Sequence, residues 1–181
     1  AAEHTVGLLL ALSRNIPQAH AALKQGRWER SAHGGVELEG KTLGVLGFGR
    51  IGQQVARRAI GLGMRVVAYD PFVSKERFRE LGADRAETTD DVLDAAEFLT
   101  LHLPLTAETT AILDATAIAR LPGGARIVNA ARGELVDDSA QHRTILSRQR
   151  RHESTISALG RSACSARAST ERRHAFLRSS I

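Results

Sequence analysis

The sequence of 181 residues predicts an α/β fold built on a doubly wound parallel sheet. From Thr42 to Asn129, short apolar segments alternate with longer amphipathic ones, as expected for strands that are joined by crossover helices. A glycine-rich segment follows the first apolar segment, and an acidic residue ends the second. Because crossovers between parallel strands are right-handed, we expect helices on both faces of the sheet.

The segment before the sheet has the pattern of a leading helix, from Ala2 to about Gln25. Its broad apolar face consists of Val6, Leu9, Leu10 and Leu12. Pro17 should break or kink this helix, because proline lacks the N–H group that an internal helical turn requires. Residues 33–41 then form a loop that leads into the sheet.

Four apolar segments are the candidate strands, at 43–46, 65–69, 98–101 and 126–129. Helical segments lie between them, at 51–61, 74–81, 90–95 and 115–120. The Thr-Thr-Asp-Asp segment at 88–91 predicts a helix N-cap with acidic residues in the first turn. With about four strands the sheet is incomplete, and we expect strand 126–129 to be an exposed apolar edge.

The positive charge of the chain is concentrated at its C-terminal end. The formal net charge is +5, but residues 141–181 hold nine Arg and two Glu, which leaves residues 1–140 slightly acidic. We expect a domain over 1–140, with a helical segment at 1–32, and an irregular Arg/Ser-rich tail over 141–181 that is disordered or poorly packed. The tail lacks interleaved aromatic residues and any nucleic-acid-binding motif, so we expect no nucleic-acid partner.

The sequence predicts neither a membrane span nor a disulfide. Its longest apolar run, 6–12, is too short to cross a bilayer, and Cys164 is the single cysteine. We therefore expect a cytoplasmic protein. Because the first residues already have a helical pattern, we also expect the chain to be a piece of a longer protein.

The glycine-rich segment has the spacing of a dinucleotide-binding loop. Gly47, Gly49 and Gly52 lie between a strand and a helix, and Asp70 ends the next strand, 23 residues after Gly47. In such Rossmann-like folds the glycines allow a tight turn, approach of a pyrophosphate and close helix packing, and the acid binds ribose hydroxyls. Since a carboxylate repels a 2′-phosphate, NAD is the expected cofactor. The structural alternative is a tight turn with Asp70 capping its strand.

Two more loops leave the same edge of the sheet, after strands 98–101 and 126–129. Pro104 stiffens the first loop, and His102 either lines the cofactor site, packs in the core or acts as an acid or base. Arg132 lies in the second loop, where a guanidinium suits a carboxylate or keto acid. The alternative for Arg132 is a surface ion pair with Glu134 or Asp137. We expect no metal site.

Residues 2–140 resemble the nucleotide-binding domain of the D-isomer-specific 2-hydroxyacid dehydrogenases. The resemblance lies in long segments such as VELEGKTLGVLGFGRIGQQVA, HLPLTAET and IVNAARGELVD, and it covers about three quarters of the chain. It implies NAD-linked oxidation of a small 2-hydroxy acid. It also implies a homodimer, for which segment 1–32, with the first helix and the region of Trp28, is the dimerisation segment.

The resemblance further implies roles for individual residues. Arg50 and Ile51 would contact the pyrophosphate, and Asp70 the adenosine ribose. Leu103 and Pro104 would flank the cofactor, with Ala130 and Ala131 near the nicotinamide. Arg132 would orient the carboxylate and carbonyl of the substrate, as the one catalytic residue that the chain retains.

The sequence departs from the family after Ala140. The family continues with segments similar to DVFxxEP and PHxG, which carry a Glu and a general acid/base His, and neither segment is found here. No role passes to His142, His152 or His174. A shift of reading frame near residue 141 would account for the change. We therefore expect the chain alone to be inactive, and the alternative function is a non-catalytic module for NAD binding or dimerisation.

Overall fold

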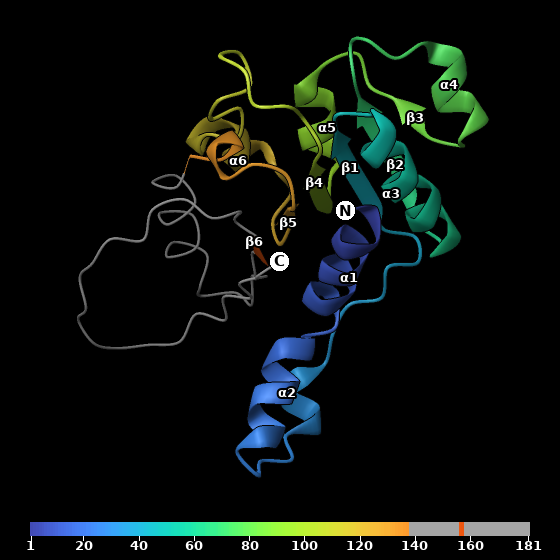
Figure 1. Ribbon diagram of the computed structural model, residues 1–181. Coiled ribbons are helices and arrows are strands. Elements are labelled where there is room, and N and C mark those ends of the chain that lie inside the picture. The colour runs from blue at the N-terminus through green and yellow to red at the C-terminus, as the bar shows by residue number, and fades with distance from the viewer. Residues whose placement is uncertain (138–155, 158–181) are drawn as a thin grey trace.

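A computed structural model describes residues 1–137 and 156–157 (Figure 1). These residues form a parallel sheet with the strand order β3-β2-β1-β4-β5-β6. The strands are β1 Thr42–Leu46, β2 Arg65–Tyr69, β3 Asp84–Arg85, β4 Phe98–Leu101, β5 Arg126–Asn129 and β6 Ile156–Ser157. This is the order of a doubly wound dinucleotide-binding sheet, so the predicted fold class is confirmed.

Helices follow most of the strands. They are α1 Ala2–Ser13, α2 Ile16–Lys24, α3 Arg50–Gly61, α4 Lys75–Glu80, α5 Thr89–Ala95 and α6 Ala115–Arg120, with short 3-10 turns η1 Arg30–His33 and η2 Gly133–Leu135. Thr88 caps α5 in a capping box with Asp91, as the sequence predicts. The reciprocal hydrogen bonds satisfy N–H groups that the first helical turn leaves unpaired.

The core lies on both faces of the sheet. Val66 and Ala68 of β2 pack into the cluster that includes α1 and α3, whereas Val67 packs into the cluster that includes α5 and α6. Because successive side chains of a strand point to opposite faces, this alternation shows that each face is covered by its own helices. The doubly wound arrangement follows directly from the buried pattern of the strands.

The four predicted strands form the centre of the sheet, but the sheet is wider than the sequence predicts. It has six strands, because β3 and β6 add two residues each. Such short strands carry no recognisable alternation. The expectation that β5 is an edge is wrong, since Val128 and Asn129 pair with Ile156 and Ser157. Apart from β6, the predicted tail lies outside the described residues.

The leading helix divides into two helices at Asn15, and not at Pro17. Asn15 has a φ of 52°, and Pro17 lies in the first turn of α2, where the missing N–H of a proline has no cost. Helix α2 and turn η1 project away from the sheet, beyond α1 (Figure 1). None of the helices in 1–137 is long and apolar enough to span a membrane.

Candidate functional site

The candidate site lies where the loops after β1, β2, β4 and β5 meet. The strand order reverses its direction here, because β2 lies on one side of β1 and β4 lies on the other. In open α/β sheets a ligand binds in the crevice that forms at this point, beyond the carboxyl ends of the strands. The sequence-predicted site residues all belong to these loops or to the start of α3.

The three glycines of the loop after β1 have three different environments. Gly47 has a φ of +91°, and a Cβ there would lie 2.7 Å from the His102 carbonyl group. A Cβ at Gly52 would lie 2.1 Å from the carbonyl oxygen of Gly47. A Cβ at Gly49 would have no atom within 4 Å. Gly47 and Gly52 therefore permit tight packing, and Gly49 leaves open space at the N-terminus of α3.

The start of α3 is accessible from that open space. Arg50 is exposed, and Ile51 is 44% exposed although it is apolar. The first N–H groups of a helix have no partner within the helix, and the helix dipole makes this end partly positive. A phosphate group suits such a position.

The Asp70 carboxylate is fixed against the loop after β1, residues 47–49, which we call the glycine loop. One oxygen, Oδ2, accepts a hydrogen bond of 2.8 Å from the Phe48 N–H, and Oδ1 accepts one of 2.9 Å from the Phe72 N–H. A carboxylate has about four acceptor positions, so both oxygens can still accept hydroxyl groups. The side chain is partly buried, and its two hydrogen bonds join the loop after β1 to the loop after β2.

His102 is held in place at the start of the loop after β4. Its backbone N–H donates to the Leu46 carbonyl at 2.7 Å, and its ring Nε2 lies 3.1 Å from the Thr100 hydroxyl. Burial lowers the pKa of His102 to about 4. The imidazole is therefore neutral at pH 7, which favours packing or lining of the site over proton donation. Leu103 packs on the core, and Pro104 is exposed beside it.

The loop after β5 is shaped by Asn129, a residue that the sequence analysis did not single out. Asn129 is only 1% exposed. Its amide donates to the Arg132 carbonyl at 2.8 Å, and its Oδ1 accepts from the Ala131 N–H at 3.0 Å. A polar residue that ends an otherwise apolar strand was the available signal. These bonds fold the loop so that the Arg132 side chain is exposed.

The remaining residues of this loop lie on the two cores. Ala130 packs against the cluster of α1 and α3, and Ala131 against the cluster of α5 and α6. Within residues 1–137, Arg132 forms no ion pair with Glu134. In the same part of the chain, no three His, Cys, Asp or Glu side chains are placed to bind a metal ion.

Comparison with known proteins identifies the family. Residues 6–152 match the sequence model of the D-isomer specific 2-hydroxyacid dehydrogenase, NAD binding domain. The chain belongs to this family. The match extends beyond the predicted boundary at Ala140, and the division into domain and tail stays a prediction.

Two curated relatives of this dehydrogenase family bear the same name. The D-3-phosphoglycerate dehydrogenase of Mycobacterium bovis is 51% identical over 140 residues, which cover 77% of this chain and 26% of that protein. The D-3-phosphoglycerate dehydrogenase of Methanocaldococcus jannaschii is 47% identical over 144 residues, which cover 80% of this chain and 28% of that protein. The chain thus spans about a quarter of the length of the relatives it matches.

A solved structure of a similar dehydrogenase has the same fold. The D-lactate dehydrogenase from Aquifex aeolicus, complexed with NAD and lactic acid, has a TM-score of 0.79 and 31% sequence identity. The similarity covers 87% of this chain and 46% of that one. The cofactor of the family is NAD, and the open space at Gly49 together with the partly free Asp70 oxygens suits it.

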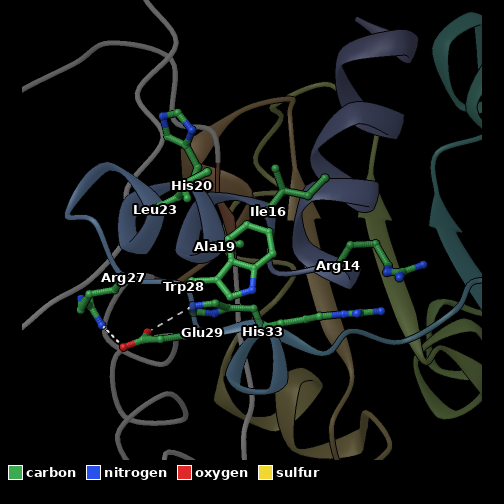
Figure 2. A pocket seen from close by; sticks show the side chains of 10 residues that line it. Arg14, Ile16, Ala19, His20, Leu23, Arg27, Trp28, Glu29 and His33 are labelled. Carbon is green, nitrogen blue, oxygen red and sulfur yellow. Dashed lines mark hydrogen bonds and ion pairs between the residues drawn. The ribbon is translucent and has the colours of Figure 1, made fainter.

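A second concave surface of this dehydrogenase domain lies on α2 and η1, far from the glycine loop. It is an open groove of about 620 Å³. Figure 2 shows the Trp28 ring beside Ile16 and Ala19, with His33 and Glu29 at its margin. Trp28 is 81% exposed, Leu23 56% and Ile16 52%. An exposed cluster of large apolar side chains is typical of an interaction surface.

Proposed function

We propose that this chain is the cofactor-binding part of a dehydrogenase that oxidises 3-phosphoglycerate to 3-phosphohydroxypyruvate with NAD, a reaction of serine biosynthesis. The identities of 51% and 47% to D-3-phosphoglycerate dehydrogenases support this substrate. The site supports the cofactor, through the open Gly49 and the fixed Asp70 carboxylate. A cytoplasmic location is part of the same proposal.

The proposed roles follow the geometry of the loops. Asp70 accepts the hydroxyls of the adenosine ribose, and the start of α3, with Arg50 and Ile51, receives the pyrophosphate. His102, Leu103 and Pro104 form one wall of the site. Ala130 and Ala131 lie toward the nicotinamide end, on the loop that Asn129 holds.

Arg132 is the residue that we place against the substrate. Its exposed guanidinium can hold a carboxylate through two parallel hydrogen bonds. Bound NAD would supply the acceptor for a hydride from C2 of the hydroxy acid, and a base would have to remove the hydroxyl proton. Loss of a positioned base reduces the rate by about a hundred- to ten-thousandfold. We assign no base within the described residues, and we propose that this chain alone turns over substrate negligibly.

The groove on α2 and η1 supports the second part of the proposal, a homodimer. A second copy of the chain would cover Ile16, Leu23 and Trp28, which are exposed here. The same feature favours the alternative function, a non-catalytic module that binds NAD and dimerises. Turnover of 3-phosphoglycerate and NAD at an ordinary rate would exclude this alternative, and it would also overturn the proposed inactivity.

Calorimetric titration with NADH and NADPH tests the cofactor site. Asp70→Asn removes the charge and one acceptor oxygen, so we expect NADH affinity to fall at least about tenfold. NADPH affinity should not fall, since the repulsion of the 2′-phosphate is removed. Asp84→Asn is the matched control, because Asp84 is an exposed carboxylate on β3 that pairs with Arg65. Absence of NADH binding by the folded wild-type chain would overturn the proposal.

A further inference from the structure

Phe48, in the middle of the glycine loop, is held through its N–H, its carbonyl and its ring. Its N–H donates to Asp70, and its carbonyl accepts a 2.8 Å hydrogen bond from Gln53 Nε2. Its ring is fully buried and stacks on Phe78, with ring centroids 4.3 Å apart and an interplanar angle of 10°. The flanking Gly47 and Gly49 give the loop little stiffness of their own. Contacts to Phe48 therefore set the position of the loop.

Two of these three contacts lead to helix α4. Phe78 belongs to α4 itself. Gln53 lies on α3, and its Oε1 accepts a hydrogen bond of 3.0 Å from Arg77 Nε on α4. Arg77 Nη1 in turn donates to Glu80 at 2.8 Å. A continuous series of hydrogen bonds thus connects Glu80, Arg77 and Gln53 to the Phe48 carbonyl.

We propose that Gln53 and Arg77 are positioning residues for the adenosine half of the cofactor. Within the described residues neither side chain forms a hydrogen bond with Asp70, and both act through the backbone of Phe48. Gln53 holds the carbonyl of Phe48 while Asp70 holds its N–H, so loss of Gln53 lets the loop shift and disturbs one of the two N–H groups that hold the Asp70 carboxylate. This inference rests on the proposed function, because it assigns the Asp70 site to the ribose.

The bonding pattern separates the roles of the two side chains. Of these two side chains, only Gln53 forms a hydrogen bond with the glycine loop. Arg77 reaches the loop only through Gln53. Its side chain is 48% exposed, so its substitution leaves the core intact. Gln54 and Lys75 provide matched controls on the same two helices. Gln54 accepts a 2.8 Å bond from Arg58, and Lys75 pairs with Glu87 at 3.2 Å; within the described residues no hydrogen bond connects either one to the glycine loop.

The test is calorimetric titration of the whole chain with NADH and with ADP-ribose, next to thermal unfolding without ligand. We expect Gln53→Met to raise both dissociation constants about fivefold, the effect of one lost hydrogen bond. Gln53→Glu keeps the acceptor for Arg77 but cannot donate to Phe48, so it should show the same loss. Arg77→Ala should raise the constants about twofold, and Arg77→Lys should restore them. Gln54→Met and Lys75→Ala should bind as the wild type does.

Three results would overturn the inference. Gln53→Met and Gln54→Met would bind equally well, or Gln53→Met would only lower the Tm and leave both dissociation constants unchanged at 25 °C, or Arg77→Lys would bind as poorly as Arg77→Ala. Should Gln53→Met not fold, the exposed Arg77 variants decide alone. A wild-type chain that binds neither ligand would refute the proposed function itself, whereas normal wild-type binding with unaffected variants would refute only the positioning roles.

Discussion

The two glycines that flank Arg50 and Ile51 give a prediction in which stability and cofactor binding separate. A Cβ at Gly52 would lie 2.1 Å from the Gly47 carbonyl oxygen, whereas a Cβ at Gly49 would have no atom within 4 Å. Gly52→Ala should therefore destabilise the fold. Gly49→Ala should leave the fold unchanged and fill the space that the cofactor phosphates need.

The size of each effect follows from these distances. An ordinary contact begins at 3.4 Å, so Gly52→Ala must move α3 away from the loop by more than 1 Å. Overpacking of this kind costs about 1–3 kcal/mol, or about 4–12 °C of Tm for a domain of this size. Gly49 has a φ of −72°, which alanine adopts readily. Its substitution at the N-cap should change the stability by less than about 1 kcal/mol.

Calorimetry of unfolding and titration with NADH check both effects. A methyl group at residue 49 should weaken NADH binding at least about tenfold, by keeping a phosphate from charge-assisted hydrogen bonds. Gly61→Ala is a control at the other end of α3, where a Cβ also meets no atom within 4 Å. Wild-type NADH affinity in Gly49→Ala would show that the phosphates do not bind here, and an unchanged Tm in Gly52→Ala would refute the close-packing argument.

Three further variants test other parts of the chain. The pKa of His102 is about 4 in the folded chain and 6.5 without burial, so the unfolded state takes up a proton first as the pH falls. In urea unfolding, the free energy of unfolding should therefore fall by about 2 kcal/mol between pH 7.5 and pH 5, and His102→Gln should remove this loss. An identical pH dependence in the variant would contradict this prediction. Asn129→Ala leaves the Ala131 N–H and the Arg132 carbonyl without their partner, and it should lower the free energy of unfolding by about 2–3 kcal/mol; a loss below about 0.5 kcal/mol would refute the buried bonds. Trp28→Glu should shift a homodimer to monomer in sedimentation velocity, and a dimer that persists would place the interface elsewhere.

The sequence allowed prediction of the central sheet because those strands are strongly apolar. Segments 43–46, 65–69, 98–101 and 126–129 each recur as strands of the structure, with bounds that differ at most by one residue. The strands β3 and β6 have only two residues each, so their existence depends on a neighbouring strand and not on their own sequence. The division at Asn15 was also missed, since a left-handed asparagine has no local pattern that distinguishes it from one inside a helix.

The candidate site was predictable to the extent that it depends on backbone conformation. The φ of +91° at Gly47 strongly favours glycine, and the 2.1 Å distance at Gly52 leaves no room for a Cβ, so both positions are visible from the spacing of the glycines. The residues that hold those backbone groups are a different matter. Gln53 and Arg77 are 24 residues apart and lie on two helices, and an exposed Gln or Arg on a helix is usually only a solvated side chain.

For Asp70, the feature that predicts its role from the sequence differs from the contacts that position its side chain in the structure. Its position at the end of β2 predicts contact with a ribose, whereas the structure shows that both of its oxygens first accept backbone N–H groups, from Phe48 and Phe72. A carboxylate that is held in this way cannot rotate freely, so its remaining acceptor positions have fixed directions before any ligand arrives. Preorganisation of this kind reduces the entropy that binding would otherwise lose. If Asp70 binds the ribose as we propose, the affinity for the cofactor depends on the backbone of Phe48 as well as on the charge of Asp70.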